Sequence, residues 1–209
     1  MMIVKPIIGG MYDSVSYLVG DNNKAVVIDA GVKCEKVLET AKELNLTIEK
    51  IILTHGHVDH ISELNEIVKN TNAMVYIHID DQNSLTDPRF NLSAYAGMST
   101  TYDGKYEVLR DGSKIQLESL EFKIIHTPGH TVGSICIEVN NTLFSGDTLF
   151  RFGYGRVDFP NGSFEDIYNS IVNKLFTLPD NMIVYPGHGN SSTIEMEKRA
   201  NPIKSSAQW

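Results

Sequence analysis

The most constraining feature of this sequence is a histidine-rich segment that directly follows a buried strand. The run Ile51–Leu53 is apolar and rich in β-branched residues, which is typical of a core strand, and the next seven residues are Thr-His-Gly-His-Val-Asp-His. In an extended loop, positions two apart face the same way, so His55 and His57 can bind one metal ion. Asp59 and His60, offset from that pair, suit a second ion. The segment therefore predicts a metal site at the end of a core strand.

Length, charge and cysteine content limit what the rest of the chain can be. We expect the 209 residues to form one domain, 1–209, with a core that needs no disulfide. Cys34 and Cys136 are far apart in the sequence, which argues against a disulfide framework and favours a reducing, cytoplasmic location. A net charge of -8 argues against nucleic acid and anionic membranes as partners. No export signal or membrane span is evident.

In the first half of the chain, short apolar runs alternate with amphipathic segments. The helix expected over residues 34–44 places its apolar side chains on one stripe, which would cover a face of a sheet. Residues 80–103 are polar and irregular, and we expect this excursion to form the wall of a pocket. The remaining pattern predicts strands at 3–8, 14–20, 25–29, 48–53 and 74–77, and a helix at 61–68.

The second half predicts another sheet and its covering helix. Ser163 and Asp166 form a capping box at the start of an amphipathic segment that runs to Leu175. A helix at 192–200 would close the chain. The strands expected here are 114–117, 121–126, 133–139, 142–145 and 182–185.

Three positions in this half share one layout with the first motif. An apolar strand ends in a turn of small residues, and a side chain able to bind metal stands in the turn: His130 in His-Thr-Pro-Gly-His, Asp147 in Phe-Ser-Gly-Asp and His188 in Val-Tyr-Pro-Gly-His. Glycine and proline fix the backbone there and clear space beside the side chain. With these three, the candidate metal ligands number seven.

Taken together, the motifs closely resemble those of the metallo-β-lactamase superfamily, and within it the short glyoxalase II-like hydrolases. The resemblance extends from Val27-Ile-Asp-Ala-Gly31 to His188 and so covers nearly the whole chain. It implies an α/β fold, a four-layer αββα sandwich with a two-metal site along one edge. Asp29 matches the carboxylate that in this family supports the site by orienting a ligand histidine. The ligand set that it implies is His55, His57 and His130 for the first ion, Asp59, His60 and His188 for the second, and Asp147 as a bridge.

The expected chemistry follows from this ligand set. Two divalent ions roughly 3.5 to 4 Å apart can lower the pKa of a shared water to about 7, so a metal-bridging hydroxide is the expected nucleophile. Asp59 can orient that hydroxide, which makes it the candidate catalytic residue. A thiolate leaves with little need for protonation, so we expect the substrate to be a small acyl thioester similar to S-lactoylglutathione. Zinc is the first expectation for the two ions, with iron or manganese as alternatives.

The loop after Asp147 is well placed to meet the substrate. In glyoxalase II enzymes this loop carries a basic residue and a tyrosine that contact glutathione. Arg156 matches the basic residue, whereas Asp158 stands where the tyrosine is expected, and an Arg156–Asp158 ion pair is an equally good interpretation. Tyr154 is a second candidate for substrate contact. The larger enzymes also grip glutathione with a C-terminal helical domain, and this chain stops at Trp209, so the sequence leaves the thiol and the acyl group open.

Three other functions stay open. Persulfide dioxygenases share this fold and much of the segment 155–159 but use a single iron, which would leave the second site empty. A lactone or ester hydrolase would use the same hydroxide. The non-enzymatic alternative is a metal-binding regulatory protein, although structural metal sites are normally closed to further ligands. The oligomeric state is not predicted.

Overall fold

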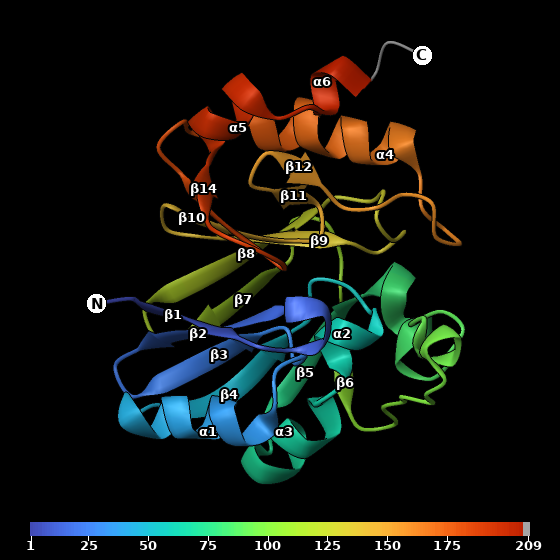
Figure 1. The fold of residues 1–209 in the computed structure, drawn as a ribbon. Helices are drawn as coiled ribbons and strands as arrows, with labels where there is room; N and C mark the ends of the chain where they lie inside the picture. Colours follow the sequence, from blue (N-terminus) through green and yellow to red (C-terminus); the bar gives the residue numbers. More distant parts are fainter. Residues whose placement is uncertain (207–209) are drawn as a thin grey trace.

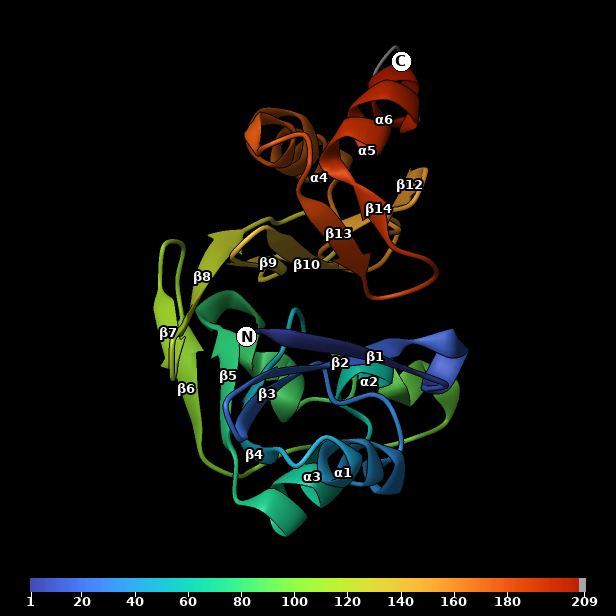
Figure 2. The same ribbon diagram turned by 90° about the vertical axis from the view of Figure 1, so that its left-hand side faces the viewer.

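Two β-sheets face each other, and helices cover the outer side of each (Figures 1 and 2). The computed structural model describes residues 1–206, and within them each of these sheets has six strands. This order of layers is the αββα sandwich that the family resemblance implies, and that expectation is confirmed. The helices of the first layer are α1 (Cys34–Glu43) and α3 (Leu64–Thr71), and those of the last are α4 (Phe164–Tyr168), α5 (Ile194–Ala200) and α6 (Ile203–Ser206).

The first sheet combines an antiparallel half with a parallel half. Its strands, in spatial order, are β1 (Ile3–Ile8), β2 (Val15–Asp21), β3 (Lys24–Ile28), β4 (Thr47–Ile52), β5 (Met74–His78) and β6 (Tyr106–Leu109). From β3 to β6 neighbouring strands are parallel. The carboxyl ends of these strands therefore lie at one edge of the sheet.

The second sheet is mostly antiparallel, but two of its neighbouring strands are parallel. β10 pairs in parallel with β13, while β8, β9 and β10 alternate in direction. The carboxyl ends of β8, β10 and β13 therefore point to the same edge. In spatial order the strands are β14 (Ser192–Thr193), β13 (Ile183–Pro186), β10 (Thr142–Gly146), β9 (Ile135–Val139), β8 (Leu120–His126) and β7 (Lys114–Leu117).

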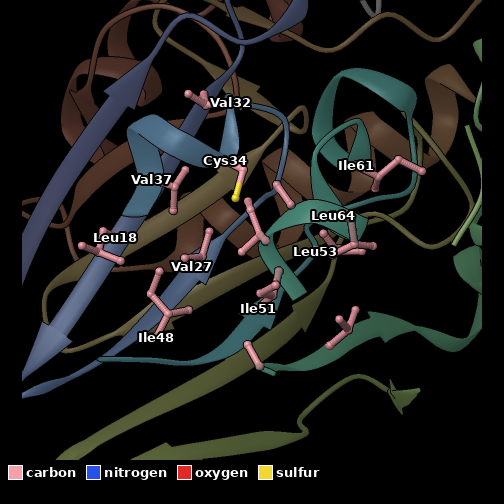
Figure 3. Close-up of a cluster of buried hydrophobic side chains, with 14 of the residues drawn as sticks. Leu18, Val27, Val32, Cys34, Val37, Ile48, Ile51, Leu53, Ile61 and Leu64 are labelled. Carbon is pink, nitrogen blue, oxygen red and sulfur yellow. The ribbon is translucent and has the colours of Figure 1, made fainter. Parts of the chain in front are cut away.

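Apolar side chains fill the space between each pair of adjacent layers. Because side chains alternate along a strand, Ala25 and Val27 of β3 pack toward α1 and α3, whereas Val26 and Ile28 face the second sheet. Figure 3 shows the cluster under the helices, with Leu18, Val27, Val37, Ile51 and Leu64 among its labelled members. A third cluster joins the second sheet to α4 and α5. The alternation seen in the sequence thus sets the order of the layers.

The structure differs from the sequence prediction at the helix expected over residues 61–68. Two helices occur instead, α2 (Val58–Ile61) and α3, because Glu63 bonds to neighbouring segments rather than continuing a helix. Its N–H donates to the carbonyl oxygen of Ala30, and its carboxylate accepts the N–H of Cys34. Glu63 thereby ties α3 to the loop after β3.

Other differences concern short or solvent-facing segments. β6 is an edge strand that the sequence did not reveal, since its residues show no clear alternation. A two-stranded hairpin, β11 (Leu149–Phe150) and β12 (Gly153–Tyr154), was also missed. α5 begins at Ile194, two residues later than expected, because β14 precedes it. The predicted cap of α4 is confirmed: the hydroxyl of Ser163 accepts the N–H of Asp166.

The helices are short. Within residues 1–206, none combines the length and the apolar character that crossing a bilayer requires.

The core between the sheets yields a first testable prediction. Phe122 on β8 is fully buried there, and Phe122→Ala should lower the free energy of unfolding by about 3 to 5 kcal/mol, since the sheets on either side cannot collapse fully into the space. Val108→Ala on β6 is the control, because Val108 is 44% exposed and should cost no more than about 0.5 kcal/mol. Urea unfolding measures both, and equal losses would contradict this assignment of the core.

Candidate metal centre

The predicted metal ligands come together because they follow strands that end at the same edge. β3 and β4 are parallel, so Asp29 after β3 and the histidine motif after β4 are neighbours. In the second sheet Gly146 of β10 pairs with Pro186 of β13, which brings Asp147 beside His188. The edge at the carboxyl ends of such strands is where α/β proteins usually bind ligands. Here both sheets contribute to one site.

The first group of donors consists of three buried imidazoles. His55, His57 and His130 each offer one ring nitrogen, and these nitrogens lie within 4.8 Å of one another. Nδ1 of His57 is 2.9 Å from Nε2 of His130. Nε2 of His55 is buried without a hydrogen-bond partner among the described residues. Three nitrogens at this spacing suit one divalent ion.

The second group mixes a carboxylate with two imidazoles. Oδ2 of Asp59 lies 3.1 Å from Nε2 of His188, and that nitrogen is 3.3 Å from Nε2 of His60. Ligand atoms of all three residues fall within 4.8 Å of one another. The two groups predicted from the resemblance are thus each assembled in space. Their binding of metal stays a prediction.

Asp147 lies between the two groups. Its Oδ2 is 3.6 Å from Nε2 of His130 in the first group and 3.5 Å from Nε2 of His188 in the second. Its Oδ1 is 3.4 Å from Nε2 of His60 but makes no hydrogen bond within the described residues. A buried carboxylate oxygen without a hydrogen bond is costly unless a cation partners it. This oxygen and Nε2 of His55 therefore fit a site for two divalent ions.

Glycine is required beside Asp147. A Cβ at Gly187 would collide with Oδ1 of Asp147 and lie 2.7 Å from Cε1 of His60. As predicted, the glycine of the Pro-Gly-His turn leaves room beside the candidate metal donors.

The ring nitrogens that face away from the site are held by hydrogen bonds. Nδ1 of His130 lies 2.8 Å from the carbonyl oxygen of Arg156, and Nδ1 of His188 lies 3.1 Å from that of Tyr12. A carbonyl only accepts, so each Nδ1 carries the proton and donates it. Nε2 of both rings is thereby left free to bind a metal.

Asp29 makes the contact that its predicted role requires. Its Oδ2 lies 2.8 Å from Nδ1 of His60, so Nε2 of His60 points toward Asp59 and Asp147. The same carboxylate accepts the backbone N–H and the hydroxyl of Thr54, at 2.7 and 2.8 Å. Asp29 therefore fixes one ligand ring and the start of the loop that carries two others.

Asp81 is a positioning residue that the sequence analysis missed. Its buried carboxylate accepts the N–H of Gly56 at 3.0 Å, between His55 and His57, and the hydroxyl of Thr131 at 2.8 Å, next to His130. It also accepts the N–H of Gly133 at 2.8 Å. One side chain thus joins the two loops of the first group. Nothing in the local sequence distinguishes Asp81 from the other polar residues of the irregular segment 80–103.

The two groups differ in charge before any metal binds. Burial, together with the neighbouring His130, lowers the pKa of His57 to about 3, and burial lowers the pKa of His55 well below its usual value. Burial acts in the same direction on His60, but Asp29, Asp59 and Asp147 together raise its pKa well above the usual value. The pKa of His188 is also raised, against burial, by its hydrogen bond to Asp59 and by Asp147. His55 and His57 are therefore neutral at neutral pH, whereas His60 and His188 tend to hold protons.

Beside the donors lies a cavity of about 680 Å³, within the usual size range of ligand sites of roughly 300 to 1,000 Å³. Arg156, predicted to contact substrate, lines it, whereas Tyr154 does not; the Tyr154 ring packs near Phe164 instead, with centroids 6.1 Å apart. The irregular excursion forms part of the wall, as predicted. The lining side chains are Tyr12, His57, Val58, Asp59, Leu92, Tyr95, Ala96, His130, Asp147, Phe150, Arg156, Phe159, Pro160 and His188.

The sequence matches the Metallo-beta-lactamase superfamily over residues 9–188, and the chain belongs to this superfamily. An uncharacterized protein of Mycobacterium leprae, ML0493, is 37% identical over 216 residues, covering 97% of this chain and 98% of that protein. The hydroxyacylglutathione hydrolase GloC of Haemophilus influenzae is 32% identical over 190 residues, covering 89% of this chain and 90% of GloC. The predicted resemblance to a short glyoxalase II-like form is confirmed.

Two solved structures share the fold over nearly their whole length. BLEG-1, a B3 metallo-beta-lactamase, has 33% identity and a TM-score of 0.91, with 96% of this chain and 98% of BLEG-1 covered. TTHA1623 in a di-iron-bound form has 31% identity and a TM-score of 0.83, with 95% and 98% covered. The family and the donor set together support a metal-dependent hydrolase with a binuclear site.

The different charges of the two groups predict different pH dependence of metal binding. His60 and His188 must release protons to bind a metal through Nε2, because their pKa values are raised, whereas His55 and His57 are already neutral. Affinity for the second ion should therefore rise between about pH 6 and pH 8, by up to about tenfold per pH unit for each proton displaced. Zinc titration against a chelating dye would measure this, and a steeper dependence for the first ion would contradict it.

Loss of the Asp81 carboxylate should weaken the first group. Asp81→Asn should lower affinity for the first ion by about tenfold, because the amide cannot accept all three hydrogen bonds that join the two loops. Asp80→Asn is the matched control, since Asp80 is an exposed neighbour with none of these bonds. Competition titrations of both variants measure the effect. Equal affinities would show that the loops hold their positions without Asp81.

Proposed function

We propose that this protein is a binuclear metallohydrolase that cleaves a small acyl thioester. The observation that carries the proposal is the position of Asp147, whose carboxylate lies within 3.4 to 3.6 Å of donors from both groups. The cavity opens directly onto that carboxylate. Similarity to GloC, a hydroxyacylglutathione hydrolase, supports the thioester as the bond that is broken.

The seven donors divide into two sets around this carboxylate. His55, His57 and His130 would hold one ion, Asp59, His60 and His188 the other, and Asp147 would contact both. Two divalent ions, when bound, would supply hydroxide at neutral pH and polarise the substrate carbonyl. Zinc remains the first candidate and iron or manganese the alternatives, because imidazole and carboxylate donors accept all three.

Asp59 has the properties of a group that orients the attacking water. Burial alone would raise its pKa, but His60 and the hydrogen bond from His188 lower it, so the carboxylate is ionised at neutral pH. Asp59 also lines the cavity, whereas Asp29 and Asp81 do not. An ionised carboxylate at that surface can accept a hydrogen bond from water and aim its lone pair at a bound carbonyl.

The acids available in the cavity favour a thioester over an amide. Apart from the metal donors, the titratable side chains lining it in the described part of the chain are Tyr12, Tyr95 and Arg156. Phenol and guanidinium groups are weaker acids than the imidazolium and carboxylic acid groups that enzymes commonly use as general acids. An amine leaving group needs a proton, whereas a thiolate, whose conjugate acid has a pKa of about 8.5, does not. Activated lactones would satisfy the same condition.

Metal loading with a matched variant tests the proposal. The purified protein would be loaded with zinc, iron or manganese in turn, its bound metal counted, and loss of the thioester of S-lactoylglutathione followed. Asp147→Ala should abolish turnover and reduce bound metal below two ions per chain, whereas Asp103→Ala, at an exposed site, should change neither. Asp59→Ala should lower both metal affinity and rate.

Three outcomes would count against the proposal. Full activity in Asp59→Ala or Asp147→Ala would remove their assigned roles. One bound iron with oxygen uptake on a persulfide would indicate the dioxygenase instead. Two bound ions with hydrolysis of lactones or of a β-lactam, but of no thioester, would keep the hydrolase and change its substrate; the likeness to BLEG-1 makes the β-lactam a necessary comparison.

A further inference from the structure

Apart from the metal donors, Arg156 and two tyrosines, the walls of the cavity are apolar. Val58, Leu92 and Ala96 form one part of the lining, and Phe150, Phe159 and Pro160 form another. At the rim, Tyr12 and Tyr95 line the cavity although they are 70% and 73% exposed. Large aromatic side chains left in contact with water beside a pocket are typical of surfaces that a ligand covers. A bound molecule would bury both rings.

The cation on this wall is already paired. Arg156 donates from Nε to Oδ1 of Asp158 at 2.9 Å and from Nη2 to Oδ2 at 2.7 Å, which is a bidentate arrangement. Its guanidinium also lies over the ring of Phe159, 4.3 Å from the centroid. Among the lining residues in the described part of the chain, no other lysine or arginine occurs. An anionic ligand would therefore have to compete with Asp158 for this guanidinium.

This inference rests on the proposed thioesterase function. We propose that the cavity selects thioesters whose acyl and thiol parts are both uncharged. An aromatic or branched alkyl group of the substrate would pack against the rings of Tyr12, Tyr95 and Phe159. Glutathione carries two carboxylates and one ammonium group, so its thioesters would bring net negative charge to this wall. The net charge of the chain, -8 from its amino acids, stays negative with two divalent ions bound and so disfavours an anionic ligand. Neutral thioesters avoid that cost and gain from the aromatic contacts.

Asp158 is, on this proposal, the residue that excludes anionic substrates. Removing its charge frees the Arg156 guanidinium to pair with a carboxylate of the substrate instead. Tyr95 has the complementary role, since its ring offers an apolar contact and, in the described part of the chain, its side chain makes no hydrogen bond to a metal donor. Substitution of Asp158 therefore tests selection by charge, and substitution of Tyr95 tests apolar binding.

Binding of stable analogues tests the selectivity without requiring turnover. S-benzyl-N-acetylcysteamine and S-benzylglutathione carry the same aromatic group and differ in the charge of the thiol part. Calorimetry on the metal-loaded protein should give at least about tenfold tighter binding of the neutral thioether, which is the effect of about one charged contact. Equal binding, or tighter binding of the glutathione thioether, would overturn the inference.

Two variants and a matched control assign the effect to the wall. Asp158→Asn should tighten S-benzylglutathione about fivefold to tenfold and leave the neutral thioether within about twofold. Tyr95→Ala should weaken the neutral thioether by up to about tenfold. Glu195→Gln frees Arg199 on α5 in the same way, away from the lining residues, and should change neither affinity. Identical behaviour of Asp158→Asn and Glu195→Gln would contradict the role of Asp158.

Turnover of the matching thioesters separates this inference from the proposed function. Phenylacetyl-N-acetylcysteamine should be hydrolysed with a higher kcat/KM than phenylacetylglutathione, the difference residing in KM. Selective binding without hydrolysis of either thioester would sustain the cavity chemistry and refute the thioesterase. Hydrolysis with preference for the glutathione thioester would support the thioesterase and refute the proposed selectivity of the cavity.

Discussion

The buried carboxylate of Asp147 places a strong electrostatic constraint on the centre of this site. It is nine-tenths or more buried, and donors of both imidazole groups lie within 3.6 Å of it, so its charge has to be compensated inside the protein. Burial opposes its ionisation, yet His60, His130 and His188 lower its pKa. The parallel pair of β10 and β13, and the glycine at position 187, keep it beside His188. A divalent ion on either side would complete this compensation.

The donor side chains are kept in position by hydrogen bonds to residues around the site. Asp29 links β3 to His60 and Thr54, and Asp81 links the excursion to the loops of the first group. The backbone carbonyls of Tyr12 and Arg156 orient the last two rings. Each of these partners comes from a different segment, so the ligand geometry is shared among both sheets and their loops. The hydrophobic layers that fix the sheets relative to each other therefore also fix the metal site.

Most strands, the covering helices and the seven candidate donors could be predicted from the sequence because they depend on local signals, whereas the αββα order of the layers came from the family resemblance. Strand alternation, the turn before His188 and the histidine spacing at 55–60 are short patterns with a direct physical meaning. The features that the sequence analysis missed depend on distant partners. Glu63 interrupts a helix by bonding to Ala30 and Cys34, and Asp81 acts through Gly56 and Thr131. Tyr154 looked suitable for substrate contact, but whether its ring reaches the cavity is decided by packing against α4.

One side of the cavity rim, at Tyr12, is structurally linked to the metal donors, whereas the side at Tyr95 is not. Tyr12 adopts a left-handed backbone conformation, φ 54°, followed by Asp13 at φ 60°, and this bend aims its carbonyl oxygen at Nδ1 of His188 while its ring lines the cavity. A change in the backbone conformation at Tyr12 would therefore disturb the second donor group together with the apolar wall. Tyr95, carried by the excursion, has no such bond to a donor. Substrate preference can consequently vary through the excursion without loss of the metal site, whereas the Tyr12 side of the cavity is tied to the chemistry.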